Sequence, residues 1–205
     1  MVNSTDVKAL FNKANIFYDQ QRYDEAIEYY DKVLTIDPSN FNSLNGKALI
    51  LRNLKRYDEA IKYYDKVLDI DPTHLNALYN KANIFESLQE NDEAIKYYDQ
   101  ALAIDPKNVD ALFNKGAALD TLGQSEKAIT WYDKVLTIDP KNVDALNNKA
   151  YALANLGKNE EAFLLVNKLL ESNSDDESYI ATAAFIMYNL GKIDDAKLYY
   201  IKLCK

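Results

Sequence analysis

The chain has 205 residues, of which 48% are hydrophobic and 12% aromatic, and its formal net charge is −8 at pH 7. Nucleic acids and anionic membranes attract clustered Lys and Arg, so this charge argues against both and favours a protein or peptide partner that is neutral to basic. No apolar run approaches the about 20 residues that span a bilayer, and residues 1–6 lack the regions of a signal peptide, so we expect a cytoplasmic protein without a membrane segment.

Prolines divide the chain at equal intervals. The chain has four of them, they lie 34 residues apart, and each ends the tripeptide Ile-Asp-Pro: Pro38, Pro72, Pro106 and Pro140. A fixed period of about 20–50 residues is typical of repeat proteins, in which each unit packs on its neighbours. With the proline as position 32, a lead-in of residues 1–6 precedes six repeats. The repeats are 7–40, 41–74, 75–108, 109–142, 143–176 with a degenerate end, and an incomplete 177–205.

The pattern of each repeat predicts two helices joined by a short polar turn. In the first repeat Leu10, Ala14 and Phe17 share one helical face, and a second apolar series follows after the turn. Proline cannot continue a helix, and the residue two positions beyond it is placed to cap the next one. The predicted caps are Asn40, His74, Asn108 and Asn142. The pattern therefore predicts an all-α protein built of helical hairpins.

Small and large residues alternate between fixed positions of the repeat. Position 8 is Ala or Gly and position 20 is always Ala, which lets two helix backbones approach closely. Position 24 is large enough to fill the space that these residues leave. Its occupants are Tyr30, Tyr64, Tyr98, Tyr132, Val166 and Tyr200.

This combination of a 34-residue hairpin, small positions 8 and 20, an aromatic position 24 and a proline at position 32 resembles the tetratricopeptide repeat, from Val7 to Lys205. The resemblance implies a right-handed α-solenoid of about six hairpins. Its first helices would line a concave groove, with positions 2, 5, 6, 9, 12 and 13 facing inward.

One departure from the family is the lysine at position 7, where the family often has leucine. We expect the lysine stems to pack and the ammonium groups to reach a carboxylate at the repeat junction, with the Asp before each proline as the candidate. The lysines are Lys13, Lys47, Lys81, Lys115 and Lys149.

Amide side chains recur at the implied groove positions. Asparagine carries donors and an acceptor, so a row of them can pair with the backbone of an extended peptide. Such a row is similar to the asparagine ladder in the repeat arm of O-linked N-acetylglucosamine transferases. The alternative is that the amides are solvated or brace neighbouring helices. The candidates are Asn12, Asn15, Asn45, Asn80, Asn83, Asn114, Asn147 and Asn148.

Aromatic and charged residues accompany these amides. The aromatic candidates, which would anchor partner side chains, are Phe11, Tyr18, Tyr79, Phe113 and Tyr151. Arg52 lies early in the series and Asp120 late, so the groove becomes more acidic along its length. Position 5 holds no lysine, so the carboxylate clamp of heat-shock co-chaperones is not expected.

The sequence offers no constellation for catalysis. His74 is the one histidine, Cys204 is the one cysteine, and no glycine-rich phosphate loop occurs. We therefore expect no enzyme activity, no cofactor and no metal site.

The expected function is a scaffold that binds an extended peptide in its groove. One alternative is a homo-oligomer formed through the C-terminal hairpin, whose apolar strip of Tyr199, Tyr200, Ile201 and Leu203 has no polar cover, unless the chain is part of a longer protein. Another is the substrate-selecting arm of a larger enzyme.

Overall fold

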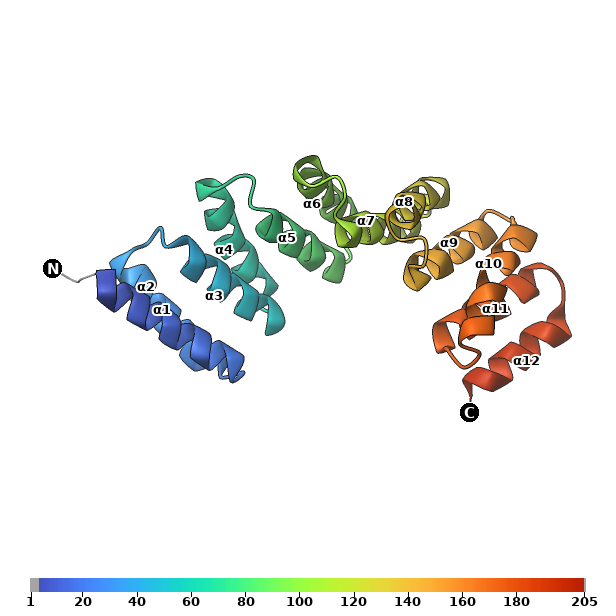
Figure 1. Ribbon diagram of the computed structural model, residues 1–205, viewed down its shortest axis with the longest axis horizontal. Coiled ribbons are helices and arrows are strands. Elements are labelled where there is room, and N and C mark those ends of the chain that lie inside the picture. Colours follow the sequence, from blue (N-terminus) through green and yellow to red (C-terminus); the bar gives the residue numbers. More distant parts are fainter. Residues whose placement is uncertain (1–3, 205) are drawn as a thin grey trace. The chain divides into compact units, whose positions relative to one another are not determined.

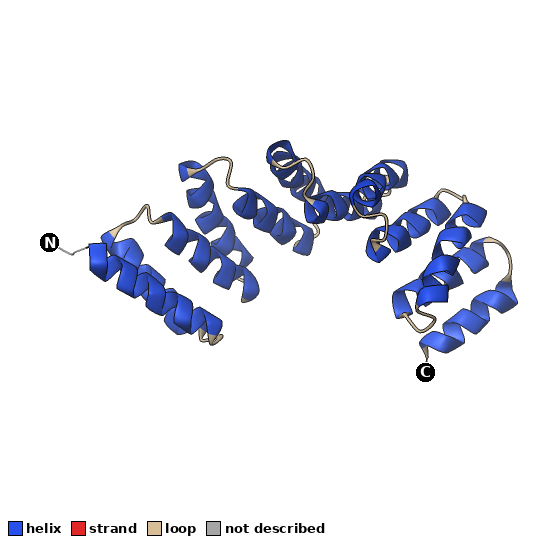
Figure 2. Cartoon of the chain, in the orientation of Figure 1, coloured by secondary structure: helices blue, strands red, loops and turns tan. Residues whose placement is uncertain are grey.

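The computed structural model describes residues 4–204, and these contain helices and no strand (Figures 1 and 2). The all-α prediction is therefore confirmed. Residues 4–6 of the predicted lead-in belong to the first helix, and residues 1–3 lie outside the described part. The helices are α1 (Ser4–Asp19), α2 (Tyr23–Ile36), α3 (Phe41–Asn53), α4 (Tyr57–Ile70), α5 (Leu75–Ser87), α6 (Asn91–Ile104), α7 (Val109–Thr121), α8 (Ser125–Ile138), α9 (Val143–Asn155), α10 (Asn159–Ser172), α11 (Glu177–Asn189) and α12 (Ile193–Leu203).

The helices fall into two compact units, Met1–Ile104 with α1 to α6 and Asp105–Lys205 with α7 to α12. In both units each odd-numbered helix pairs with the even-numbered helix that follows it. The odd-numbered helices also contact one another, as α1 does α3 and α7 does α9, so they form one layer of their unit. We call this layer the first-helix face. The even-numbered helices form the second layer.

The core of each of the first four hairpins is built around the tyrosine at position 24. Tyr30 and Tyr132 are at most 3% exposed. A Cβ atom added to Gly46 of α3 would lie 2.6 Å from Cζ of Tyr30, and one added to Gly116 of α7 would lie 2.7 Å from Cε1 of Tyr132. The tyrosine rings therefore occupy space that small residues on the first helices leave open, as the sequence predicts.

The last of these tyrosines departs from the prediction. Tyr200 of α12 is 48% exposed, so it does not fill an interior gap. In the first hairpin the ring is covered partly by the first helix of the next hairpin, because a Cβ atom added to Gly46 of α3 would lie 2.6 Å from Tyr30. Among the described residues no helix follows α12.

The predicted helix caps are confirmed. Asn40 Oδ1 accepts the Ser43 backbone N–H at 3.1 Å, and His74 Nδ1 accepts that of Ala77 at 3.1 Å. The same bond recurs at 2.9 Å at both Asn108 and Asn142. Each bond satisfies one of the backbone donors that a helix start leaves without a partner.

The predicted partner of the position-7 lysines is wrong. Lys47 Nζ lies 2.5 Å from Asp31 Oδ1, Lys149 Nζ lies 2.6 Å from Asp133 Oδ1, and Lys81 pairs with Asp65. These carboxylates stand at position 25, on the second helix of the preceding hairpin. The lysine therefore joins consecutive hairpins, although through a different acid from the one expected.

The Asp before each proline accepts hydrogen bonds from the connection between two hairpins instead of pairing with a lysine. Asp37 Oδ1 accepts the backbone N–H of Ser39 at 3.2 Å, and Asp71 Oδ1 accepts that of Thr73 at 2.9 Å. Bonds from the Ser39 and Asn40 side chains hold the pKa of Asp37 below its usual value. This carboxylate follows the end of a helix, where an Asx turn uses it to hold the connection to the next hairpin.

The turn inside each hairpin contains one residue with a left-handed backbone, at position 15. In the first unit the residue is not glycine, with φ of 58° at Gln21, 58° at Lys55 and 62° at Gln89. In the second unit it is glycine, with φ of 73° at Gly123, 75° at Gly157 and 73° at Gly191.

The His74 cap predicts a pH dependence of stability. Burial lowers the pKa of His74, and the charge of Asp71 opposes this effect. Nδ1 accepts a hydrogen bond only in the neutral imidazole, so the cap stabilises the fold above the unfolded pKa of about 6.5 and is lost as the pH falls through the lower folded value. His74→Asn restores the cap of the other junctions. We expect the wild type to lose about 0.5–1 kcal/mol relative to this variant between about pH 7 and 5, measured by urea unfolding. Parallel pH profiles of the two proteins would contradict it.

The lysine junction predicts a mutational hierarchy. Lys81 is 5% exposed, donates to Asp65 and to the Tyr97 hydroxyl, and its Nζ lies 4.3 Å from the Tyr97 ring centroid. We expect Lys81→Ala to cost about 2–3 kcal/mol of unfolding free energy, because packing and polar bonds are lost together. Lys81→Met keeps the stem and should cost about 1 kcal/mol or less.

The control for this series is Lys96→Ala. Lys96 is exposed and pairs with Glu93 on its own helix, so its loss should change the unfolding free energy much less than Lys81→Ala does. Urea unfolding at neutral pH measures all three variants. Equal costs for Lys81→Met and Lys81→Ala would show that the stem does not stabilise the junction.

Candidate binding face

The candidate groove residues all lie on odd-numbered helices. The first unit carries Asn12, Asn15 and Tyr18 on α1, Asn45 and Arg52 on α3, and Tyr79, Asn80 and Asn83 on α5. The second unit carries Phe113, Asn114 and Asp120 on α7, and Asn147, Asn148 and Tyr151 on α9. Asn12 and Tyr151 are exposed, Asn147 is buried, and the others are half-buried. Each unit therefore gathers its own candidates on its first-helix face.

Two of the asparagines accept hydrogen bonds from buried tyrosines. Tyr30 donates to Asn15 Oδ1 and Tyr98 donates to Asn83 Oδ1, each at 2.6 Å. Glu86 Oε2 also lies 2.7 Å from the Tyr98 hydroxyl. For Asn15 and Asn83 the structure thus has the bracing contact that the sequence left as the alternative.

Burial around these tyrosines also affects their ionisation. The pKa of Tyr30 is raised to about 12, mainly by burial and then by the nearby Tyr18 and Asp19. The hydroxyl therefore stays protonated at neutral pH and remains a donor to Asn15.

Charged candidates are also engaged within the chain. Arg52 of α3 donates to Asn80 Oδ1 of α5 and, at 3.3 Å, to Asn53. Asp120 of α7 accepts the Ser125 hydroxyl at 2.5 Å, at the start of α8. Arg52 thus links two first helices, whereas Asp120 holds the turn of its own hairpin.

The position-5 aromatics pack on the core tyrosines instead of standing free. Ring centroids are 5.9 Å apart for Phe11 and Tyr30, and 5.9 Å apart for Phe113 and Tyr132. Tyr79 has the same relation to Tyr98, at 6.0 Å. Each of these rings is therefore partly buried within its hairpin, and its remaining surface contributes to the first-helix face.

A pocket of about 250 Å³ opens on the first-helix face between α1 and α3. Tyr30 of α2 and Gly46 of α3 are among the residues that line it. Phe11, Asn15 and Tyr18 line it from α1. Asn45 lines it from α3, and the buried Oδ1 atom of Asn45 has no hydrogen-bond partner. The pocket therefore combines aromatic side chains with asparagine side chains.

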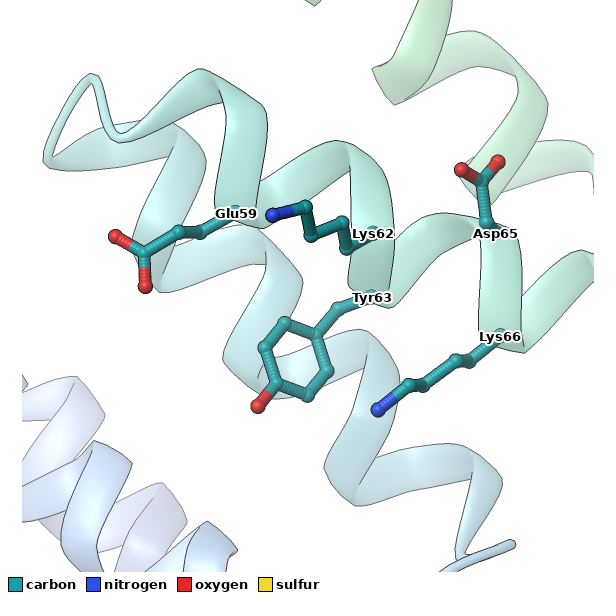
Figure 3. Close-up of a pocket in the computed structure, with 5 residues that line it drawn as sticks. All are labelled: Glu59, Lys62, Tyr63, Asp65 and Lys66. Carbon is teal, nitrogen blue, oxygen red and sulfur yellow. The ribbon is translucent and has the colours of Figure 1, made fainter.

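Another hollow, of about 470 Å³, lies on the opposite layer and is lined by α4 alone (Figure 3). Tyr63 stands in it beside Lys66, whose Nζ lies 4.9 Å from the ring centroid, and Lys47 Nζ lies 4.6 Å from the same centroid. This lysine–aromatic–lysine arrangement recurs at Tyr29 and Trp131.

The recurrence makes the α4 hollow part of the junction, since each ring stabilises a lysine through cation–π contact. Sequence reasoning missed these contacts. The sequence pattern that could have predicted them is an aromatic residue at position 23 with a lysine at position 26, which occurs in several repeats.

No group of three His, Cys, Asp or Glu side chains in residues 4–204 is arranged to hold a metal ion. Within the same residues no helix has the length and apolar character needed to cross a membrane.

Six helical hairpins, the first four with an interior tyrosine, and a face of first helices define a helical-repeat protein. Models of the tetratricopeptide repeat match residues 7–40, 39–107, 79–143 and 131–163. The chain belongs to the tetratricopeptide repeat family, whose fold serves generally as a scaffold for protein interaction. A comparison with curated proteins finds no match.

Solved structures share this fold. A tetratricopeptide repeat protein from Parabacteroides merdae matches with a TM-score of 0.89 and 23% identity, over 96% of this chain and 78% of its own. MamA matches with a TM-score of 0.76 and 25% identity, over 84% of this chain and 94% of its own. YrrB, described as a TPR protein with an unusual peptide-binding site, matches with a TM-score of 0.70 and 20% identity, over 85% and 90%.

Proposed function

We propose that the chain is a scaffold that holds an extended segment of a partner protein on its first-helix face. The observation that carries the proposal is the collection of half-buried amides and aromatic rings on one layer of each unit, with a pocket among them. Side chains of this kind pair with peptide backbone and anchor partner side chains. The net charge of −8 favours a neutral to basic segment.

Not every asparagine has the same part in this proposal. Asn15 and Asn83 hold tyrosines and Asn80 holds Arg52, so they position the face. Asn12 is exposed on α1, and Asn148 is half-buried on α9. These two are the amides that we assign to the backbone of the bound segment. The peptide-binding site in the name of the YrrB structure supports peptide binding by this fold.

The proposal predicts which amides affect affinity. Peptides selected from a random library on the immobilised chain should lose about 2–10-fold in affinity when their contact residue, Asn12 or Asn148, is changed to Ala, since one hydrogen bond contributes about 0.5–1.5 kcal/mol. Fluorescence anisotropy measures the affinity. Gln100→Ala, an exposed amide of α6 in the second layer, is the control and should change nothing. The proposal fails if the selected peptides are insensitive to both asparagines.

A second candidate function is self-association through the sixth hairpin. Leu198 and Ile201 of α12 are 63% and 55% exposed. Leu198 lines a hollow of about 470 Å³ together with Phe163, Met187 and Tyr199. Exposed apolar surface of this kind is typical of an interface between proteins.

This candidate predicts a concentration-dependent mass. Sedimentation velocity should show a dimer at high protein concentration, and Leu198→Lys with Ile201→Lys should return it to monomer because two charges would enter an apolar contact. Ile16→Lys on α1 is the matched control, as Ile16 is 55% exposed in the other unit. A wild type that stays monomeric throughout would remove this candidate.

A further inference from the structure

The α1–α3 junction has no side chain at position 6 of its second first-helix. This position is Gly46 in α3, whereas four of the six repeats have asparagine there. At the α3–α5 junction the residue is Asn80, and Arg52 of α3 donates to its Oδ1 atom, so side chains link the two helices. No side chain leaves Gly46, and the pocket of about 250 Å³ opens beside it.

The ring of Tyr30 fixes the shape of this pocket. A Cβ atom added to Gly46 would lie 2.6 Å from Cζ of Tyr30 and 2.7 Å from its hydroxyl oxygen, so the ring lies directly against α3. The hydroxyl donates to Asn15 Oδ1 of α1 at 2.6 Å, which holds the ring in place. The pocket is therefore pre-formed, and a ligand that enters it pays little to order the wall.

Position 9 of α3 makes the same junction more apolar. It is Leu49, which is half-buried, whereas α1 and α5 have Asn15 and Asn83 there. Leu49 lines the pocket together with Phe11 and Tyr18 of α1. Glycine and leucine thus replace two amides of the repeat, and aromatic side chains stand opposite them.

The polar groups of the pocket suit an uncharged ligand. None of the residues that line it carries a charge. Asn15 Oδ1 already accepts the Tyr30 hydroxyl, and Asn45 Oδ1 is buried. A charged side chain would lose hydration here without gaining an ion pair. An apolar side chain gains from leaving water, and an aromatic one gains further from contact with other rings.

The size and place of the pocket suit one side chain of a peptide. Its volume lies below the range of about 300–1,000 Å³ that is typical of sites for small molecules. It opens on the first-helix face, and Phe11 of its lining is next to Asn12, the exposed amide assigned to peptide backbone. An anchored side chain and a backbone contact at Asn12 can therefore belong to one bound segment.

We propose that the pocket beside Gly46, lined by Phe11, Tyr18, Tyr30 and Leu49, is an anchor subsite for one aromatic side chain of the bound peptide. The proposal rests on the proposed function, because it assigns one residue of the segment held on the first-helix face. It also makes Gly46 and Leu49 the residues that set specificity at this junction.

A small probe tests the subsite without the natural partner. N-acetyl-L-phenylalanine amide is titrated into the ¹³C,¹⁵N-labelled full chain, and the Gly46 backbone amide and the Leu49 methyl groups are followed by NMR. We expect saturable shifts with a Kd of about 1–10 mM, as for a single residue in an open pocket. The leucine analogue should bind at least about threefold more weakly, and the glutamine and arginine analogues should not shift these signals.

Two variants locate the probe. Leu49→Asn, which copies position 9 of α1 and α5, should weaken the phenylalanine probe at least about fivefold by removing an apolar wall. Gly46→Asn restores the side chain of the other repeats and should abolish the shift of the Leu49 methyl groups. Leu88→Asn is the matched control at a leucine that follows α5, is 38% exposed and should leave binding unchanged. Circular dichroism and thermal unfolding confirm that each variant is folded, and Leu49→Asn decides alone if Gly46→Asn is not.

A peptide-level experiment links the subsite to the face. In a selected peptide whose affinity depends on Asn12, changing its anchor aromatic residue to Ala should lower affinity about 10-fold or more in the wild type. The same change should matter about 2-fold or less in Leu49→Asn, because the two changes remove the same contact.

The outcomes separate this subsite from the proposed function. No saturable shift with phenylalanine, equal binding of phenylalanine and leucine or glutamine, or equal binding by Leu49→Asn and Leu88→Asn would overturn the aromatic subsite. If selected peptides depend on Asn12 but on no aromatic residue, the scaffold function stands and the subsite is wrong. If the probe saturates the pocket while no peptide binds the face, the subsite stands and the scaffold function is wrong.

Discussion

The structure depends on one buried tyrosine in each of the first four hairpins. Tyr30, Tyr64, Tyr98 and Tyr132 stand at position 24 of the second helix and are at most 3% exposed. A ring of this size is accommodated only because small residues on the adjacent first helices bring the two layers together. The same residue therefore sets the spacing inside a hairpin and, through contacts such as that of Tyr30 with Gly46, the spacing to the next one.

The polar end of this tyrosine connects the interior with the first-helix face. A buried hydroxyl needs a partner, and for Tyr30 and Tyr98 the partner is an asparagine of the same hairpin. Some asparagines of the face, Asn15 and Asn83, consequently satisfy the interior, whereas Asn12 is exposed. Where position 9 is not asparagine, as at Leu49 of α3, the face has a different composition, so each junction offers its own set of groups.

The fold could be predicted from the sequence because its determinants are local and recur. The caps at Asn40 and His74 depend on residues three positions away, and the periodic small residues identify the packing seam. The partner of Lys47 could not be chosen, because Asp31 and Asp37 are both near the junction in sequence and only the direction of each side chain separates them. The role of Asn15 was equally open, since its bond to Tyr30 spans 15 residues.

The left-handed residue of each hairpin turn destabilises the fold by a different mechanism in the two units. Gln21, Lys55 and Gln89 have a Cβ atom and are held in a conformation that costs about 1–2 kcal/mol. This cost is steric and raises the free energy of the native state. The glycines of the second unit avoid this crowding, but they enlarge the ensemble of the denatured chain. An entropic cost of folding grows with temperature, whereas a steric cost does not. Heating therefore destabilises the turns of Asp105–Lys205 more than those of Met1–Ile104.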